Sequence, residues 1–427
     1  MPGSGQTEPD RQGGAEETGL RVFGRIGLLS FGGPAGQIAL MHRELVERRG
    51  WLSEAEYLRA LAFCMLLPGP EAMQLATYAG WRRGGVAGGL VAGGLFVLPG
   101  AAVVLLLAAL YAAFGHLPAV SALFLGIKAA VVAIVVEALV RVAHRALGGS
   151  GQRLIAVAAF VAIFVLSLPY PLIVLAAGLA GALALPRHPA LPAPLPANPR
   201  LAATLAAGLA LWWAPVALAA AAGRSFLADV GLYFSQLAVV TFGGAYAALA
   251  YMTQTTVHDF GWLTTAQMLD ALGLAETTPG PLILVTEFVA FLAGDGRGGA
   301  GLGLAAAAMT LWVTFVPCFL WVFAFAPYIE WIATRPRLGA ALSGVGAAVV
   351  GVIGTLALWF ATHVFFAATV PITAGPFAMV LPDPASLQPA PALIALGAGW
   401  LLLFRRWNLV AVLLLAAFAG GGIAAIG

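Results

Sequence analysis

Two Pro-Gly-Pro tripeptides stand where this sequence could perform chemistry. Pro68-Gly69-Pro70 and Pro279-Gly280-Pro281 each divide an apolar stretch in two. A proline lacks a backbone donor and restricts the residue before it, so each tripeptide ends one helix and starts another. A helix that starts inside a membrane presents free N–H groups and the positive end of its dipole, which suit an anion. The two breaks therefore predict an anion-binding site.

A glycine-rich segment forms a second kind of break. Ser30 precedes Phe31-Gly32-Gly33-Pro34, and Thr241 precedes Phe242-Gly243-Gly244. Glycines permit a close backbone approach, and Thr277 and Thr278 stand before the second Pro-Gly-Pro, at N-cap positions. The alternative for each break is a helix kink required for packing. The residues predicted to bind substrate are Ser30, Gly32, Gly33, Pro34, Gln37, Pro68, Gly69, Pro70, Lys128, Thr241, Gly243, Gly244, Thr277, Thr278, Pro279, Gly280 and Pro281.

Lys128 is the only lysine in the chain and lies midway along the apolar run 119–140. A lysine there costs roughly 2.5–3.5 kcal/mol on insertion scales unless it faces a polar cavity or a partner. No acidic residue lies three or four positions away, so the partner comes from another helix or is the substrate. We expect Lys128 to bind the anion. The alternatives are a structural pair with Glu71, Glu276 or Glu287, and snorkelling toward an interface.

Three carboxylates beside the Pro-Gly-Pro breaks are candidates for proton coupling: Glu71, Glu276 and Glu287. Carboxylates inside a membrane commonly take part in proton relays, although Glu71 in a first helical turn would also complement the dipole. Glu137 and Arg141 are four apart and are predicted to pair where a span leaves the membrane. The histidines and cysteines show no metal-ligand spacing, so we predict neither a metal site nor a cofactor.

The elements that position these residues come from a tandem duplication. Residues 30–70 match residues 241–281 at an offset of 211, and 16 of the 41 aligned pairs are identical without a gap. The offset later becomes 218, and near the end of each half Leu154-Ile155-Ala156 matches Leu393-Ile394-Ala395. Duplicated halves with helix breaks at matching positions are typical of secondary transporters, whose site lies between the halves.

The composition places the chain in a membrane. Of the 427 residues, 61% are hydrophobic and 9% are charged, whereas a soluble domain carries roughly 25% charged residues. Alternating ten-residue segments, which are typical of an outer-membrane barrel, are absent. We therefore predict an all-α integral membrane protein. The net charge of +3 fits basic loops on the cytoplasmic side and does not predict nucleic-acid binding.

Basic residues change sides between the halves. Three arginines lie in the loop 43–50, whereas the matching loop 252–261 has no lysine or arginine. The positive-inside rule then predicts that the two halves are homologous repeats in inverted topology. Arg82-Arg83 belongs on the side of the loop 43–50, although the apolar segment 57–80 lies between them. This segment is therefore predicted to be re-entrant; the alternative is a kinked span.

The predicted organisation has five parts: a disordered polar tail (1–20), a first repeat (21–186), a Pro-rich linker (187–200), a connecting span (201–222) and an inverted second repeat (223–427). The expected continuous spans are 86–114, 119–141, 153–168 and 170–186 in the first half and 300–327, 338–362, 391–404 and 408–426 in the second. Four of them are shorter than the ~20 residues that cross a bilayer, so we expect tilted or partly buried hairpins there.

The order of motifs resembles a known family. Phe-Gly-Gly-Pro at 31–34 with Gln37 after it, then Gly50-Trp51-Leu52, then the Pro-Gly-Pro, then the inverted second copy are similar to the chromate ion transporter family in its long, two-domain form. The resemblance extends from about Arg21 to the C-terminus. It implies a multi-pass carrier of the plasma (bacterial inner) membrane for chromate, a tetrahedral dianion similar to sulfate, which usually acts in efflux and gives chromate resistance.

The second half departs from this pattern, because it reads Gly243-Gly244-Ala245 and has Ala248 where glutamine is expected. The site is therefore expected to favour the first half. The alternative function is a carrier for sulfate or another anion on the same scaffold, and a passive channel stays open. A membrane-embedded enzyme has the least support, because the six aspartates form no paired motif. The expected partners are the inorganic anion, the lipid bilayer and, as an open alternative, a second copy of the chain.

Overall fold

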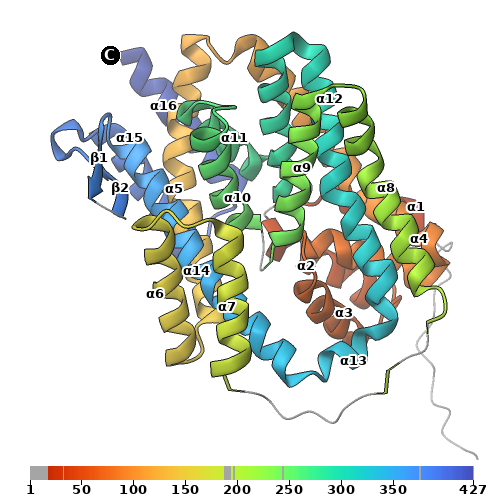
Figure 1. Cartoon of the computed structure of the whole chain (residues 1–427). Helices are drawn as coiled ribbons and strands as arrows, with labels where there is room; N and C mark the ends of the chain where they lie inside the picture. The colour runs from red at the N-terminus through yellow and green to blue at the C-terminus, as the bar shows by residue number, and fades with distance from the viewer. Residues whose placement is uncertain are drawn as a thin grey trace, which may run out of the picture.

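The chain is a bundle of helices in the computed structural model (Figure 1), which describes residues 18–31, 33–186, 194–195, 198–242, 245–374 and 377–426. Most of the predicted tail and linker lie outside the described residues, as do Gly32, Gly243 and Gly244.

The two halves contain matching series of helices. The first half holds α1 (Gly19–Leu28), α2 (Gly33–His42), a π-helical turn (Arg43–Glu47), α3 (Glu54–Leu66), α4 (Glu71–Phe114), α5 (Pro118–Ala146), α6 (Ser150–Phe164) and α7 (Tyr170–Ala184). After α8 (Leu201–Ala221), the second half begins with α9 (Ser225–Val240), α10 (Ala245–Gln254), a π-helical turn (Thr255–Asp259) and α11 (Thr265–Thr277). It continues with a 3-10 turn (Leu282–Leu284), α12 (Val285–Phe325), a 3-10 turn (Ala326–Tyr328), α13 (Ile329–Ala333), α14 (Pro336–Phe365), strands β1 (Thr369–Ala374) and β2 (Phe377–Pro382), a 3-10 turn (Pro384–Ser386), α15 (Pro389–Gly399), a π-helical turn (Trp400–Phe404) and α16 (Leu409–Ile426).

The duplication extends to the helix caps. Helices α3 and α11 begin and end 211 residues apart. The hydroxyl of Ser53 caps α3 by accepting from the Glu56 amide, and the hydroxyl of Thr264 caps α11 by accepting from the Gln267 amide. A hydroxyl at the N-cap satisfies one of the donors that a helix leaves free at its start. A hydroxyl residue at the equivalent position therefore begins both helices.

Several helices are long and apolar enough to span a bilayer. Among the described residues they are α4, α5, α8, the segment Leu282–Tyr328 that contains α12, and α14. The chain is therefore a multi-pass membrane protein. The shorter helices α6, α7, α15 and α16 correspond to the four short spans expected from the sequence.

Helices α4 and α12 each turn back on themselves at a pair of glycines. Gly85 has a φ of +61° and Gly299 a φ of +76°, which glycine adopts without a steric penalty. In α4 the two arms touch so closely that a Cβ on Gly88 would lie 2.4 Å from the carbonyl oxygen of Gly80. The predicted spans 86–114 and 300–327 are the second arms of these hairpins.

The first arm of α4 returns to the level at which α3 began. Glu56 lies in the first turn of α3 and Arg82 at the end of the first arm of α4, yet Arg82 Nε lies 2.7 Å from Glu56 Oε1. The segment between them contains the Pro68-Gly69-Pro70 break. This is the geometry expected of a re-entrant segment.

The halves exchange their short helices. The hairpin of α6 and α7 packs on α14 of the second half, and the hairpin of α15 and α16 packs on α5 of the first half. In Figure 1, α4 passes to α5 at the top of the view, whereas α12 passes through α13 to α14 at the bottom, so α5 and α14 run in opposite directions.

Helices make up most of the described chain, as predicted, and strands β1 and β2 are a small addition that was not predicted. They pair antiparallel, from Thr369 with Pro382 to Ala374 with Phe377. The hairpin occupies the connection between α14 and α15, whereas the equivalent connection between α5 and α6 has only residues 147–149. The repeat comparison contains no counterpart of this insertion, which is why it was not predicted.

Candidate functional site

The breaks of the two halves are joined to each other by backbone hydrogen bonds. The Gly69 amide donates to the Thr241 carbonyl at 2.8 Å, and the equivalent Gly280 amide donates to the Ser30 carbonyl at 2.9 Å. Each Pro-Gly-Pro of one half is thus held by the glycine-rich break of the other. Broken backbone inside a membrane needs such partners, because lipid offers none.

Packing around the two Pro-Gly-Pro glycines follows the same exchange between halves. A Cβ on Gly69 would lie 2.7 Å from Cys318 Sγ, on α12 of the second half. In return, a Cβ on Gly100, on α4 of the first half, would lie 2.4 Å from the Pro279 carbonyl oxygen. Gly69 and Gly280 have φ values of +116° and +91°. Small residues are therefore required at both places where a Pro-Gly-Pro segment of one half packs against the other half. We call this region, where the four breaks meet, the crossing.

Two glutamines of the first half bind carbonyls at these breaks. Gln37 is buried, and its Nε2 donates to the Gly280 carbonyl at 2.7 Å and to the Ser30 carbonyl at 3.4 Å. Gln74 Nε2 donates to the Pro68 carbonyl at 2.7 Å. The second half has Ala248 in place of Gln37. The crossing is therefore asymmetric.

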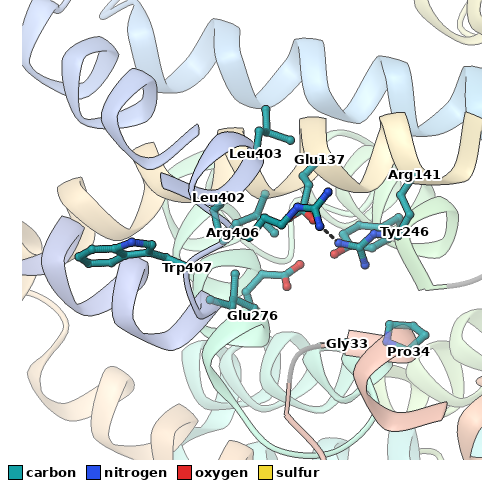
Figure 2. Close-up of a pocket in the computed structure, with 12 residues that line it drawn as sticks. Gly33, Pro34, Glu137, Arg141, Tyr246, Glu276, Leu402, Leu403, Arg406 and Trp407 are labelled. Carbon is teal, nitrogen blue, oxygen red and sulfur yellow. Dashed lines mark hydrogen bonds and ion pairs between the residues drawn. The ribbon is translucent and has the colours of Figure 1, made fainter. Parts of the chain in front are cut away.

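A cavity of about 370 Å³ lies next to these breaks (Figure 2). We name it the arginine cavity. It is lined by Gly33, Pro34, Ile134, Glu137, Arg141, Tyr246, Glu276, Leu402, Leu403, Arg406, Trp407 and Leu409. Its walls therefore come from α2, α5, α10, α11 and the turn between α15 and α16, that is, from both halves.

Two guanidinium groups meet two carboxylates in the arginine cavity. Arg141 forms an ion pair with Glu137, one helical turn earlier on α5, and the Arg406 side chain extends toward the same pair (Figure 2). Arg406 lies in the connection between α15 and α16 with a φ of +53°. Glu276 is only 7% exposed. When both carboxylates are ionised, the charges of these four groups sum to zero. When one carboxylate is protonated, the net charge of the four groups is +1.

An adjoining cavity of about 300 Å³ shares Pro34, Arg141 and Tyr246 with the arginine cavity. It adds Gly69 and Glu71 from the first Pro-Gly-Pro and Arg145 from the next turn of α5. The two cavities together thus contact both kinds of break.

The structure brings together part of the predicted site. Gly33, Pro34 and Gly69 line the cavities, as do the predicted coupling residues Glu71 and Glu276. Ser30, Gln37, Thr241 and Gly280 lie at the crossing of the breaks. The Ser30 hydroxyl is buried and has no hydrogen-bond partner among the described residues.

Thr277 and Thr278 do not cap the helix that follows. Their hydroxyls donate back to the Leu274 and Ala275 carbonyls at 2.8 and 3.2 Å. They therefore bind backbone carbonyls near the C-terminal end of α11. The N-cap position of the following helical turn is occupied by Pro281, whose side chain forms no capping hydrogen bond.

Lys128 lies outside the described lining of both cavities. Its Nζ lies 3.0 Å from Asp270 Oδ1 on α11, and Tyr111 donates to Asp270 Oδ2 at 2.7 Å. The alternative partners Glu71, Glu276 and Glu287 are therefore wrong, although the expectation that a partner comes from another helix holds. Asp270 was missed because nothing in its sequence neighbourhood distinguishes it. Glu287 is 1% exposed and also lies outside the described lining of the cavities.

Arg141, Arg406 and Tyr246 were missed as site residues. Arg141 was interpreted only as the partner of Glu137 at a helix exit. A usable signal existed for Arg406, because it follows an apolar run of only 14 residues (391–404), too short to carry it across a bilayer.

Comparison with known proteins decides the family. The family described as "Chromate transporter" matches residues 19–182 and 228–421, one match in each half. The chain belongs to the chromate transporter family.

Curated relatives agree with this membership. The chain is similar to the chromate transport protein of Pseudomonas aeruginosa, with 38% identity over 78% of each chain. It is 33% identical to a probable chromate transport protein of Synechococcus elongatus over 78% of this chain and 81% of the relative. It is 30% identical to the chromate transport protein of Cupriavidus metallidurans over 78% of this chain and 80% of the relative. No solved structure matches the chain.

Proposed function

We propose that this protein is a secondary active transporter that carries chromate out of the cell across the plasma (inner) membrane, with the anion bound in the arginine cavity. The observation that carries the proposal is the meeting of Arg141 from α5 with Arg406 from the exchanged hairpin of the other half. Arginines placed among apolar helices are costly and mark ion pathways. A planar guanidinium donates two parallel N–H bonds to an oxyanion, which suits a tetrahedral dianion.

Binding of the anion competes with Glu137 for Arg141. The Glu137 carboxylate holds this guanidinium in an ion pair through one of its oxygens. A dianion that enters the cavity replaces that single acceptor with two of its own oxygen atoms. Protonation of Glu276 adds one positive charge to the cavity balance and so strengthens anion binding. This role makes Glu276 the preferred coupling residue of the three carboxylates predicted from the sequence.

The membrane potential drives the anion outward. Moving one elementary charge through 100 mV is worth about 2.3 kcal/mol, so a dianion that leaves a negative interior without a co-transported proton gains about 4.6 kcal/mol. That energy supports a gradient of about 2000-fold. The membrane potential therefore suffices to drive efflux.

Inverted repeats supply the alternating access. The opposite directions of α5 and α14 and the reciprocal bonds Gly69–Thr241 and Gly280–Ser30 support an axis of pseudo-symmetry through the crossing. Rocking of one half against the other about a fixed crossing would expose the site to each side in turn.

The test is the flux of radiolabelled chromate into everted membrane vesicles energised to a defined potential, with unlabelled sulfate as competitor. We expect chromate uptake into everted vesicles that rises with the potential. Sulfate competition at equal concentration would assign the protein to the alternative, a carrier of tetrahedral oxyanions in general. Absence of chromate flux in either direction would contradict the proposal.

A further inference from the structure

A further cavity, lined by both apolar and polar side chains, lies beside α14 of the second half. It measures about 380 Å³ and lies between the end of α14, the α6–α7 connection, α10 and the β1–β2 hairpin. We name it the His363 cavity. Its lining is Ile163, Phe164, Ser167, Ala250, Thr253, Gln254, His258, Asp259, Thr355, Leu356, Trp359, Thr362, His363, Pro371, Met379 and Val380.

The long-helix wall of this cavity is the repeat equivalent of the wall that carries Arg141. At the offset of 218, α14 aligns with α5. Thr355 then corresponds to Glu137 and Trp359 to Arg141, and all four residues line their cavities. One turn later, His363 corresponds to Arg145, which lines the adjoining cavity of the first half.

The short-hairpin wall is equivalent as well. The match of Leu154 with Leu393 gives an offset of 239. At that offset the lining residues Ile163, Phe164 and Ser167 of one cavity fall on the lining residues Leu402, Leu403 and Arg406 of the other.

Backbone geometry supports this alignment independently. Ser167 has a φ of +50° and Arg406 a φ of +53°, and they are the two non-glycine residues with positive φ in the described part of the chain. Such a conformation is uncommon outside glycine. Its recurrence at equivalent positions shows that the two hairpin tips have the same local fold.

The two cavities differ in charge. Where the arginine cavity has Arg141 and Arg406, the His363 cavity has Trp359 and Ser167, and its titratable lining residues are His258, Asp259 and His363. His363 Nδ1 lies 2.9 Å from the Trp359 carbonyl oxygen. A carbonyl only accepts, so Nδ1 carries the proton, and a neutral ring then has no N–H left for an anion. The surface of the His363 cavity is mostly apolar, and its hydroxyl, amide and imidazole groups offer no permanent positive charge.

We infer that the His363 cavity is the low-affinity vestibule of the same oxyanion pathway, on the membrane side opposite to the arginine cavity. This inference rests on the proposed function. Helices α5 and α14, which carry the equivalent walls, run in opposite directions (Figure 1), so we expect the two cavities to open toward opposite sides of the membrane. An anion is held by the two arginines on one side and is released past hydroxyl and amide groups on the other. The β1–β2 hairpin contributes Pro371, Met379 and Val380 to the wall of this cavity.

Matched cysteines test the sidedness. In a Cys64→Ala/Cys318→Ala background, Phe164→Cys and Leu403→Cys introduce thiols at equivalent positions of the two cavities. A membrane-impermeant, sulfonate-bearing methanethiosulfonate is applied to right-side-out and to everted vesicles. We expect each thiol to react from one side only, with the two sides opposite, and each modification to lower chromate flux at least tenfold. Val157→Cys, on the exposed face of α6, is expected to remain unmodified.

Reaction of both thiols from the same side, or full flux after modification of Phe164→Cys, would overturn the vestibule. These results are distinguishable from failure of the proposed function, because thiol sidedness is measured without flux. A second variant, Trp359→Arg, places an arginine where α5 has Arg141. We expect it to lower the KM for chromate applied from the vestibule side at least threefold and to slow release. An unchanged KM from that side would also contradict the inference.

Discussion

The Gly69 amide donates to the Thr241 carbonyl at 2.8 Å, so the Pro-Gly-Pro break of the first half is fastened to the glycine-rich break of the second. The equivalent bond from Gly280 to Ser30 completes the exchange. Because these hydrogen bonds join the four broken segments, a substitution at one break alters the backbone contacts of both halves. The site is thus a property of the duplicated chain and not of either half.

Gly69→Ala is expected to reduce both stability and flux. The φ of +116° is unfavourable for alanine, and the new Cβ would lie 2.7 Å from Cys318 Sγ. Overpacking of this kind costs about 1–3 kcal/mol, so thermal unfolding in detergent should move several degrees lower. Gly94→Ala, on the following helix α4, is the control, because a Cβ there meets no atom within 4 Å. A wild-type melting temperature for Gly69→Ala would show that the crossing is not tightly packed.

Lys128→Met is expected to destabilise the fold through Asp270 and not to alter anion affinity. Removing one partner of a largely buried ion pair costs about 2–3 kcal/mol here, less than for a fully buried pair, because the Lys128 side chain is 21% exposed. Lys128→Met/Asp270→Asn should recover folded protein with a wild-type KM for chromate. A tenfold rise of KM in that double variant would restore Lys128 as an anion ligand, as the sequence first suggested.

Glu276→Gln is expected to remove the pH dependence of transport. In the proposed mechanism, protonation of Glu276 adds to the positive charge of the arginine cavity and lowers the KM. The amide keeps the cavity in that state, so the KM at pH 8 should fall about tenfold. Glu287→Gln is the control, since Glu287 is outside the described cavity lining. A Glu276→Gln protein with the wild-type pH profile would exclude this residue from coupling.

His42 connects the end of α2 to the start of α3 outside the spanning helices. Its hydrogen bond to Glu54 at 2.7 Å, together with one to Glu47 at 3.1 Å, raises the pKa of His42 above 6.5. A raised folded-state pKa contributes stability below the unfolded pKa, which is lost as the pH rises through the folded value. Wild-type protein should therefore melt above His42→Gln at pH 5.5, and the difference should shrink by pH 9. An equal difference at both pH values would contradict the ion-paired His42.

Much of the fold could be predicted from repeated residues, because these residues determine the conformation of the backbone next to them. The Pro-Gly-Pro tripeptides and the N-cap residues Ser53 and Thr264 determine the backbone of only the next few residues. The ends of helices such as α3 and α11 can therefore be predicted from the sequence. The pairing of Lys128 with Asp270 and the meeting of Arg141 with Arg406 depend on how separate helices pack. No spacing rule reaches across 142 or 265 positions, so these contacts could be found only in three dimensions. The β1–β2 hairpin was missed because it interrupts the repeat and has no first-half counterpart.

The claim that the arginine cavity binds the anion is tested most directly by the KM for radiolabelled chromate of Arg141→Gln and Arg406→Gln in energised everted vesicles. Arg141→Gln is also measured with Glu137→Gln, so that no carboxylate is left without its partner, and Arg405→Gln serves as the neighbouring control, its guanidinium lying over the Trp400 ring. We predict that each cavity variant raises the KM at least tenfold, about 1.4 kcal/mol of lost binding, while Arg405→Gln keeps the wild-type value. A wild-type KM for Arg141→Gln/Glu137→Gln and for Arg406→Gln would contradict the account.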